Sequence, residues 1–185
     1  MNTIEAIRKR RSIMPEQFNS MEIDDNKLRI LLESANWAPT HKKTEPWRFK
    51  VLKSQSKNEL GFFLAEKYKQ KTSNFSDFKY RRLIEKTKKS SVIILICMQR
   101  DVNQSIPEWE EIASVSMAVQ NMWLAATELN IGGYWSSPPY IQNIGEFTKL
   151  NLGEKCLGIF YLGHYDKSLK NERFPNPIDE KIVVL

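Results

Sequence analysis

The spacing of apolar residues predicts the order of elements in the first half of the chain. A short helix is expected over residues 3–11, with Thr3 as its N-cap and Ile4 and Ile7 on one face. Asp24 is expected to cap a second helix, whose apolar residues Leu28, Leu31, Leu32 and Ala35 have the spacing i, i+3, i+4, i+7. Residues 47–51 alternate apolar with charged side chains, which predicts a half-buried strand containing Trp47, Phe49 and Val51. Surface helices are expected over residues 57–71 and 77–89.

The second half alternates apolar strands with one long helix. Residues 91–98 form a continuous apolar run, which predicts a strand buried on both faces. The longest helix begins at Pro107, and an apolar stripe follows at Ile112, Val115, Val119, Met122, Ala126 and Leu129. That helix fits either the centre of the core or a dimer seam. A strand over residues 132–137, a short helix over 143–150 and a strand over 156–162 come next, and the apolar terminus 182–185 is expected to join a sheet, its own or a partner's.

Length and composition indicate one globular domain over residues 1–185. Of the 185 residues, 41% are hydrophobic and 27% charged, which is not the composition of a disordered chain. Cys97 and Cys156 lie in apolar runs and are expected to be reduced core residues. No apolar run approaches the roughly 20 residues needed to span a bilayer. The sequence starts Met-Asn-Thr-Ile-Glu, with no apolar signal region, so a soluble cytoplasmic protein is expected.

The two halves of the chain differ in charge. Residues 1–89 contain 21 Lys and Arg against 11 Asp and Glu, whereas residues 90–185 contain 7 against 11. A basic half suits nucleic acid or a phosphorylated small molecule. Many of its lysines, among them Lys67, Lys71, Lys86 and Lys89, are most simply solvated helix faces.

Several chemistries have no supporting motif. The two histidines and two cysteines are not spaced as metal ligands, so no metal site is predicted. Glycine-rich nucleotide loops and a nucleophile elbow are also missing from the sequence. What remains is cations, hydroxyls and aromatics at two junctions, the stretch Arg10-Arg11-Ser12 and the loop 36–47, which contains two Trp, two Pro, His41 and two Lys. Such groups suit an enzyme whose cofactor performs the chemistry, although a basic surface turn and a packing connector are equally compatible with each stretch alone.

The order of these motifs resembles the FMN-dependent nitroreductase family, most closely its compact, short-chain bacterial branch. The resemblance runs from about Ile4 to Pro175, and the motifs that carry it are Arg10-Arg11-Ser12, Ala38-Pro39, Pro46-Trp47-Arg48-Phe49, the long helix, Gly132-Gly133-Tyr134-Trp135-Ser136-Ser137 and Leu162-Gly163. It implies an α+β sandwich with a mainly antiparallel central sheet flanked by helices, a long core helix and a C-terminal strand extension to the partner subunit. It also implies a homodimer that holds FMN at the interface and reduces small acceptors, such as nitroaromatics or quinones, with NADH or NADPH in alternating half-reactions.

The resemblance also implies the cofactor contacts. The positions that match are Arg10, Arg11 and Ser12 for the phosphate, ribityl chain and pyrimidine edge; Trp37 and His41 for the flavin of the other subunit; Ser136, Ser137 and Pro138 along the ring; and Arg173 for the phosphate. No side chain is implied to be catalytic in its own right, because the flavin performs the chemistry.

Three positions depart from the family pattern. Glu45 stands where Gln is common, Trp37 replaces a smaller residue or Arg, and Pro138 replaces a glycine. Because proline has no N–H, Ser137 is left as the backbone donor to the ring. Two alternatives stay open: a flavin enzyme of the same fold with different chemistry, such as dehalogenation or flavin fragmentation, and a non-enzymatic basic binding module.

Overall fold

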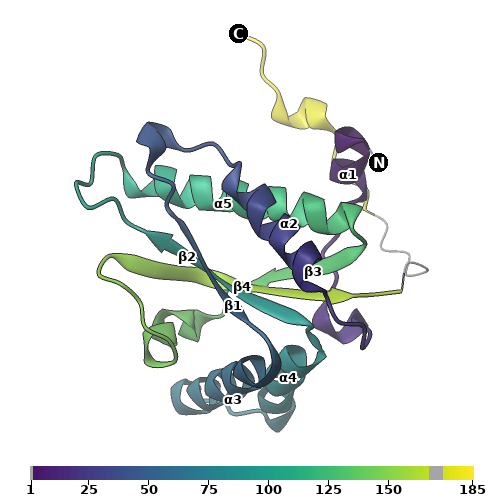
Figure 1. Ribbon diagram of the computed structural model, residues 1–185, viewed down its shortest axis with the longest axis vertical. Coiled ribbons are helices and arrows are strands. Elements are labelled where there is room, and N and C mark those ends of the chain that lie inside the picture. The colour runs from purple at the N-terminus through teal and green to yellow at the C-terminus, as the bar shows by residue number, and fades with distance from the viewer. Residues whose placement is uncertain (1, 167–172) are drawn as a thin grey trace.

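A four-stranded antiparallel sheet forms the centre of the computed structural model, which describes residues 2–166 and 173–185 (Figure 1). The strands are β1 (Trp47–Leu52), β2 (Val92–Gln99), β3 (Ile131–Ser136) and β4 (Glu154–His164), arranged in the order β1-β2-β4-β3. All three neighbouring pairs are antiparallel. The α+β class and the mainly antiparallel sheet predicted from the sequence are confirmed.

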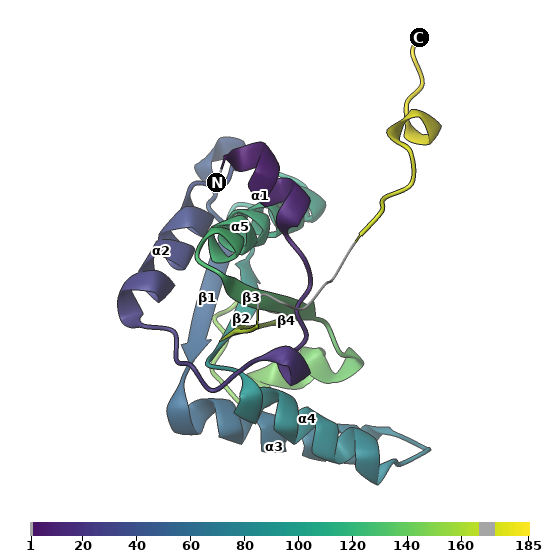
Figure 2. The same ribbon diagram turned by 90° about the vertical axis from the view of Figure 1, so that its right-hand side faces the viewer.

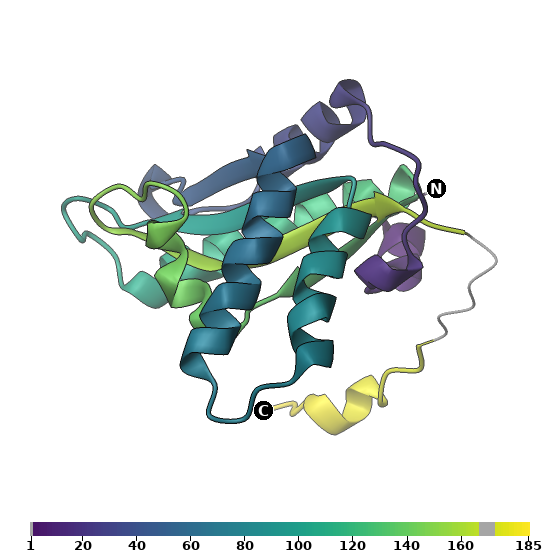
Figure 3. The ribbon, with the colours of Figure 1, turned by 90° about the horizontal axis from the view of Figure 1, so that it is seen from below.

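Helices cover both faces of this sheet (Figure 2). On one face lie α1 (Thr3–Lys9), α2 (Asp25–Asn36) and α5 (Glu108–Glu128), and on the other lie α3 (Ser54–Lys71) and α4 (Asp77–Lys89), as Figure 3 shows from below. Short 3₁₀ helices connect these elements: η1 (Pro15–Gln17), η2 (His41–Lys43), η3 (Pro139–Glu146) and η4 (Ile178–Lys181).

Strand β2 contributes to the core on both sides of the sheet. Ile94 and Ile96 pack into the cluster under α2 and α5, whereas Ile93 and Leu95 pack into the cluster under α3 and η3. All four side chains are fully buried. The prediction of a strand buried on both faces is therefore confirmed, and the unbroken apolar run is explained because successive side chains point to opposite faces.

The two cysteines face each other across β2 and β4. Cys97 and Cys156 are paired in the strand register, next to a shift in register after Ile96, and both are free. A hydrogen bond with Cys156, followed by burial, raises the pKa of Cys97 above its ordinary value. The prediction that both cysteines are reduced is confirmed, but the sequence did not indicate that they are neighbours.

Three local predictions were wrong in detail. The first helix ends at Lys9, and its N-cap is Asn2, whose side chain accepts from the backbone N–H of Glu5. Val51 was predicted to be a buried position of strand β1 but is exposed. Leu52 is buried instead, because it packs into the cluster under α3. The short helix predicted over residues 143–150 is the 3₁₀ helix η3, which starts at Pro139 because a proline fits the first turn of a helix.

Helix α5 confirms most of the predicted apolar stripe. Val115, Val119, Met122 and Ala126 are buried against the sheet and α2. Ile112 was predicted to belong to this stripe but is 37% exposed; it lies two turns before the buried Val119, at the edge of the buried stripe. Two further apolar side chains of α5 are exposed, Trp109 at 68% and Met117 at 39%. Helix α5 thus carries a buried apolar stripe and, outside it, apolar side chains that no packing covers.

The C-terminal segment lies away from the sheet (Figures 1 and 2). After Pro177 it forms η4, and Ile182 to Leu185 are exposed and pair with no strand among residues 2–166 and 173–185. No helix of the described residues is both long and apolar enough to cross a membrane.

Gly61 sets the distance between α3 and α4. A Cβ at this position would lie 2.1 Å from Oγ1 of Thr87, a fully buried side chain that donates to the carbonyl of Ile84. We expect Gly61→Ala to lower the free energy of unfolding by at least about 1 kcal/mol, because overpacking costs about 1–3 kcal/mol and outweighs the gain in helix propensity.

Urea denaturation measures this difference directly. Gly145→Ala is the matched control, since its Cβ would meet nothing closer than Leu150 at 3.8 Å, and a change within about 0.5 kcal/mol is expected. Equal stability of the two variants would show that the helices can separate freely.

Candidate cofactor site

The segment after α1 is attached to strand β3. Ser12 forms a parallel bridge with Gly133, and the N–H of Ile13 donates to the carbonyl of Gly133 at 3.0 Å. A side chain at Gly133 would collide with Phe160 at 2.7 Å, so only glycine allows the strands and helix α5 to approach this closely. The predicted motifs Arg10-Arg11-Ser12 and Gly132-Gly133 are therefore neighbours in space.

Three arginines from two distant parts of the sequence gather beside this bridge. Burial lowers the pKa of Arg10, and the positive charges of Arg173 and Arg11 lower it further. Arg173 is thus close enough to Arg10 for the two to repel each other, across more than 160 positions of sequence. A bound anion would relieve this repulsion, and guanidinium groups match the oxygens of a phosphate.

Trp123 on α5 supports this cluster. The guanidinium carbon of Arg10 lies 4.7 Å from the centre of the Trp123 ring, a cation–π contact that fixes the side chain. The indole Nε1 of Trp123 is buried and has no hydrogen-bond partner among the described residues. No signal along the chain indicated the contact of this tryptophan with Arg10.

The end of β3 continues the site along the sheet. Ser136 is the last residue of the strand and half-buried, Ser137 is exposed, and Pro138 starts the turn into η3. Since a strand rises about 3.3 Å per residue, Ser137 lies about 13 Å further along β3 than Gly133. The site thus has a cationic end and a hydroxyl-rich end, joined by the edge strand β3.

The loop 37–46 has an unusual backbone. Lys42, Lys43 and Glu45 all have positive φ, at 50°, 56° and 41°, although none is glycine. Such conformations cost about 1–3 kcal/mol each and often mark functional sites. Hydrogen bonds hold this strained loop: Trp47 Nε1 donates to Asn36 at 3.0 Å, and Thr40 accepts from the N–H of Glu45 at 3.2 Å.

The predicted site residues on this loop point outward. Trp37 is 86% exposed. His41 is also exposed, and its Nδ1 lies 2.6 Å from the carboxylate of Glu110, in the first turn of α5. Lys42 bonds the carbonyl of Ser105 at 2.9 Å. The sequence did not reveal Glu110 as the partner of His41, because the two are far apart in the chain.

One chain does not bring the two groups of predicted residues together. Glu110 and Trp123 are 13 positions apart on α5, so about 20 Å of helix separates His41 from Arg10. Figure 1 shows α1 at one end of α5 and the loop 37–46 at the other. Within the described residues, no group of three or more His, Cys, Asp or Glu side chains could hold a metal ion.

Comparisons with known proteins agree with the motifs. The model of the nitroreductase family matches residues 7–164. A Bacillus subtilis protein named "Putative NAD(P)H nitroreductase YfhC" is 28% identical over 168 residues, which cover 89% of this chain and 84% of the relative. The Escherichia coli protein "Putative NAD(P)H nitroreductase YdjA" is 27% identical over 142 residues, covering 74% of each chain.

Solved structures show the same fold. The nitroreductase-like family protein from Bacillus cereus superposes with a TM-score of 0.84 at 25% identity, over 100% of this chain and 96% of that one. A Desulfovibrio desulfuricans protein described as a "putative nitroreductase in complex with FMN" superposes with a TM-score of 0.75 at 24% identity, over 100% and 97% of the two chains. With a family match over most of its length, this chain belongs to the nitroreductase family of oxidoreductases.

Proposed function

We propose that this protein is an FMN-dependent NAD(P)H oxidoreductase that reduces nitroaromatics, quinones or related small acceptors. The observation that carries the proposal is the gathering of Arg10, Arg11 and Arg173 beside the glycine edge of β3. FMN fits this elongated site, because its phosphate matches the cationic end and its planar ring matches the hydroxyl-rich end. The FMN complex of the Desulfovibrio relative and the NAD(P)H in the names of the other relatives support the same assignment.

The residues of this chain divide the work of holding FMN. The three arginines would bind the phosphate, and Ser12 would contact the ribityl chain or the pyrimidine edge. Ser136 and Ser137 would lie along the ring, with the N–H of Ser137 as donor because Pro138 has none. When bound, FMN would supply the hydride-transfer chemistry. The arginines would add a positive potential that stabilises negative charge on the cofactor.

A homodimer would complete this site. In a two-fold dimer, contact between the exposed faces of α5 in antiparallel orientation would place the first turn of the partner's helix beside Arg10. Trp37 and His41 of each chain would then reach the other chain's cofactor. The exposed side chains of Trp109, Ile112 and Met117 support this contact, because they are apolar and the contact would remove them from water.

The C-terminal segment fits the same arrangement. Phe174, Ile182, Val183 and Leu185 are all more than half exposed, and the segment extends away from its own sheet. We propose that this arm packs on the partner subunit, as the strand extension expected from the family would. In this view residues 1–185 form one domain whose last segment belongs to the interface.

Arg10→Ala should weaken FMN binding at least tenfold. A hydrogen bond to a charged group contributes about 1.5–3 kcal/mol, and about 1.4 kcal/mol corresponds to a factor of ten. Flavin absorbance retained after dialysis measures the effect. Arg81→Ala is the control, because Arg81 is exposed on α4 and forms an ion pair with Asp77 at 2.7 Å. Equal retention of FMN by the two variants would place the phosphate elsewhere.

Mixed dimers test whether each site uses both subunits. Arg10→Ala alone and the double variant Trp37→Ala/His41→Ala alone should each bind FMN weakly at both sites. A dimer with one chain of each kind, isolated with two different affinity tags, should contain one intact site and retain one tightly bound FMN. Mixed dimers as weak as both parents would show that all these residues act within one chain.

Steady-state kinetics test the reaction scheme. If one open face of the cofactor serves NAD(P)H and the acceptor in turn, double-reciprocal plots at several acceptor concentrations should be parallel. Intersecting lines would require a complex that contains both substrates at once.

A further inference from the structure

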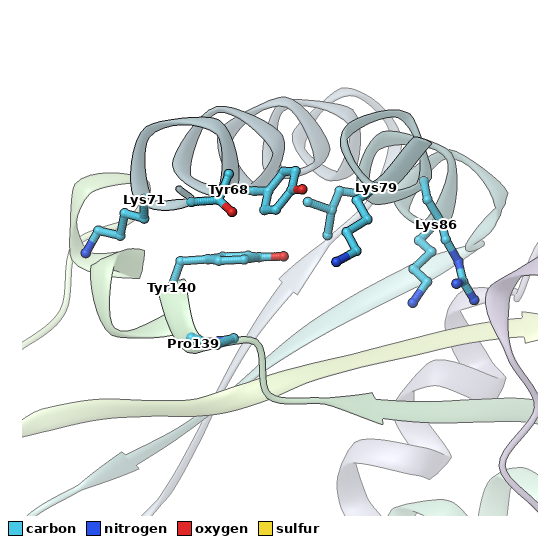
Figure 4. Close-up of a pocket in the computed structure, with 9 residues that line it drawn as sticks. Tyr68, Lys71, Lys79, Lys86, Pro139 and Tyr140 are labelled. Atoms are coloured by element: carbon cyan, nitrogen blue, oxygen red, sulfur yellow. The ribbon is translucent and has the colours of Figure 1, made fainter. Parts of the chain in front are cut away.

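On the sheet face away from α5, a cavity of about 590 Å³ lies between α3, α4 and η3 (Figure 4). This is the volume range of pockets that hold small molecules. Its wall contains two tyrosines, Tyr68 and Tyr140, and four cations, Lys71, Lys79, Arg82 and Lys86. We call it the basic cavity.

Two tyrosine rings form the apolar part of the basic cavity. Figure 4 shows the ring of Tyr140 lying beneath Tyr68, with both hydroxyls directed toward the side where Lys79 and Lys86 lie. Burial, followed by the effect of Tyr68, raises the pKa of Tyr140 to about 12. Tyr140 therefore stays a protonated donor at neutral pH, and within the described residues its hydroxyl has no hydrogen-bond acceptor.

Carboxylates balance only part of the positive charge of the basic cavity. Arg82 pairs with Glu16 at 2.8 Å, whereas Lys71 donates to the neutral side chain of Asn143 at 2.6 Å. The hydrogen bond from Lys67 and, more weakly, the charge of Lys71 lower the pKa of the nearby Glu146. Lys86 lies 5.2 Å from the ring centre of Tyr134. Lys79 makes no side-chain hydrogen bond or ion pair in the described part of the chain. Lys86 was expected from the sequence to be solvated, but it is half-buried.

The half-buried Lys86 shows the consequence of this excess of positive charge. Burial lowers the pKa of Lys86; Glu16 opposes this change, and Arg82 adds to it. A bound anion would favour the charged form of Lys86 and would pair with Lys79, which now faces solvent. Positive charge above an aromatic wall therefore matches one chemical class of ligand, a planar ring with an anionic substituent.

The basic cavity also adjoins the proposed cofactor site. Pro139 and Tyr140 of its wall directly follow Ser136, Ser137 and Pro138. Glu16, which pairs with Arg82, follows Ser12 by four positions. The cavity and the proposed cofactor site thus share connecting segments of the chain but lie on opposite faces of the sheet.

We propose that the basic cavity is a second binding site, separate from the cofactor site, for planar aromatic molecules that carry a carboxylate or sulfonate. The tyrosines contact the ring, and Lys79 and Lys86 bind the anionic group. This binding does not depend on the function proposed above.

Binding of two matched ligands to the FMN-loaded protein tests this proposal. Calorimetry should show 4-nitrobenzoate binding at least tenfold more tightly than the uncharged 4-nitrobenzamide. Lys79→Gln should remove most of this preference by weakening only the benzoate. Lys69→Gln, on an exposed position of α3 outside the cavity, is the control and should leave both affinities unchanged.

The outcomes separate this proposal from the proposed function. Equal affinity for the two ligands, or an equal effect of Lys69→Gln and Lys79→Gln, would overturn the basic cavity as an anion site even if the protein reduces nitro compounds. Benzoate binding only to FMN-free protein would also overturn it, because the cavity would then be part of the cofactor site. Selective binding of benzoate without turnover of any acceptor would support the cavity and contradict the proposed function.

Discussion

The docking of the first connecting segment on strand β3 is the contact on which the candidate site depends. One backbone hydrogen bond, from Ile13 to Gly133, and one glycine without a side chain bring the N-terminal arginines onto the sheet. Helix α5 closes this arrangement from above, since Trp123 packs edge-on against Phe160 of β4 and under Arg10. Because backbone atoms make the contact, a larger residue at Gly133 would displace the arginines together with the segment that carries them.

Helix α5 both joins and separates the predicted functional groups. Its last third supports Arg10 through Trp123, and its first turn holds His41 through Glu110. A rigid helix keeps these groups about 20 Å apart in one chain, and the two-subunit site that we propose would bring them to one ligand. The loop 37–46 is strained at Lys42, Lys43 and Glu45, and it leaves Trp37 and His41 exposed. The proposed partner subunit would cover these side chains.

The sequence predicted those features that depend on local pattern. The apolar run of β2, the capping of α2 by Asp24 and the two surface helices were recoverable, because each follows from periodicity or from one capping side chain. Ile112 was assigned to the buried stripe by its spacing, but periodicity places a residue on a helix face and does not show how far neighbouring elements cover that face. The contacts of Arg10 with Trp123, of His41 with Glu110 and of Cys97 with Cys156 join residues distant in sequence, and no local pattern encodes them.

The excess of cations in the first half of the sequence has a structural explanation. One group, Arg10 and Arg11, lies on the α5 side of the chain and meets Arg173 there. Another group, Lys71, Lys79 and Lys86, lies beyond the opposite face of the sheet around two tyrosines. In each group one cation, Arg10 or Lys86, is partly buried, and burial lowers its pKa. Concentrating like charges costs folding free energy, and two separate anionic ligands would offset that cost: a phosphate at one group and a carboxylate or sulfonate at the other.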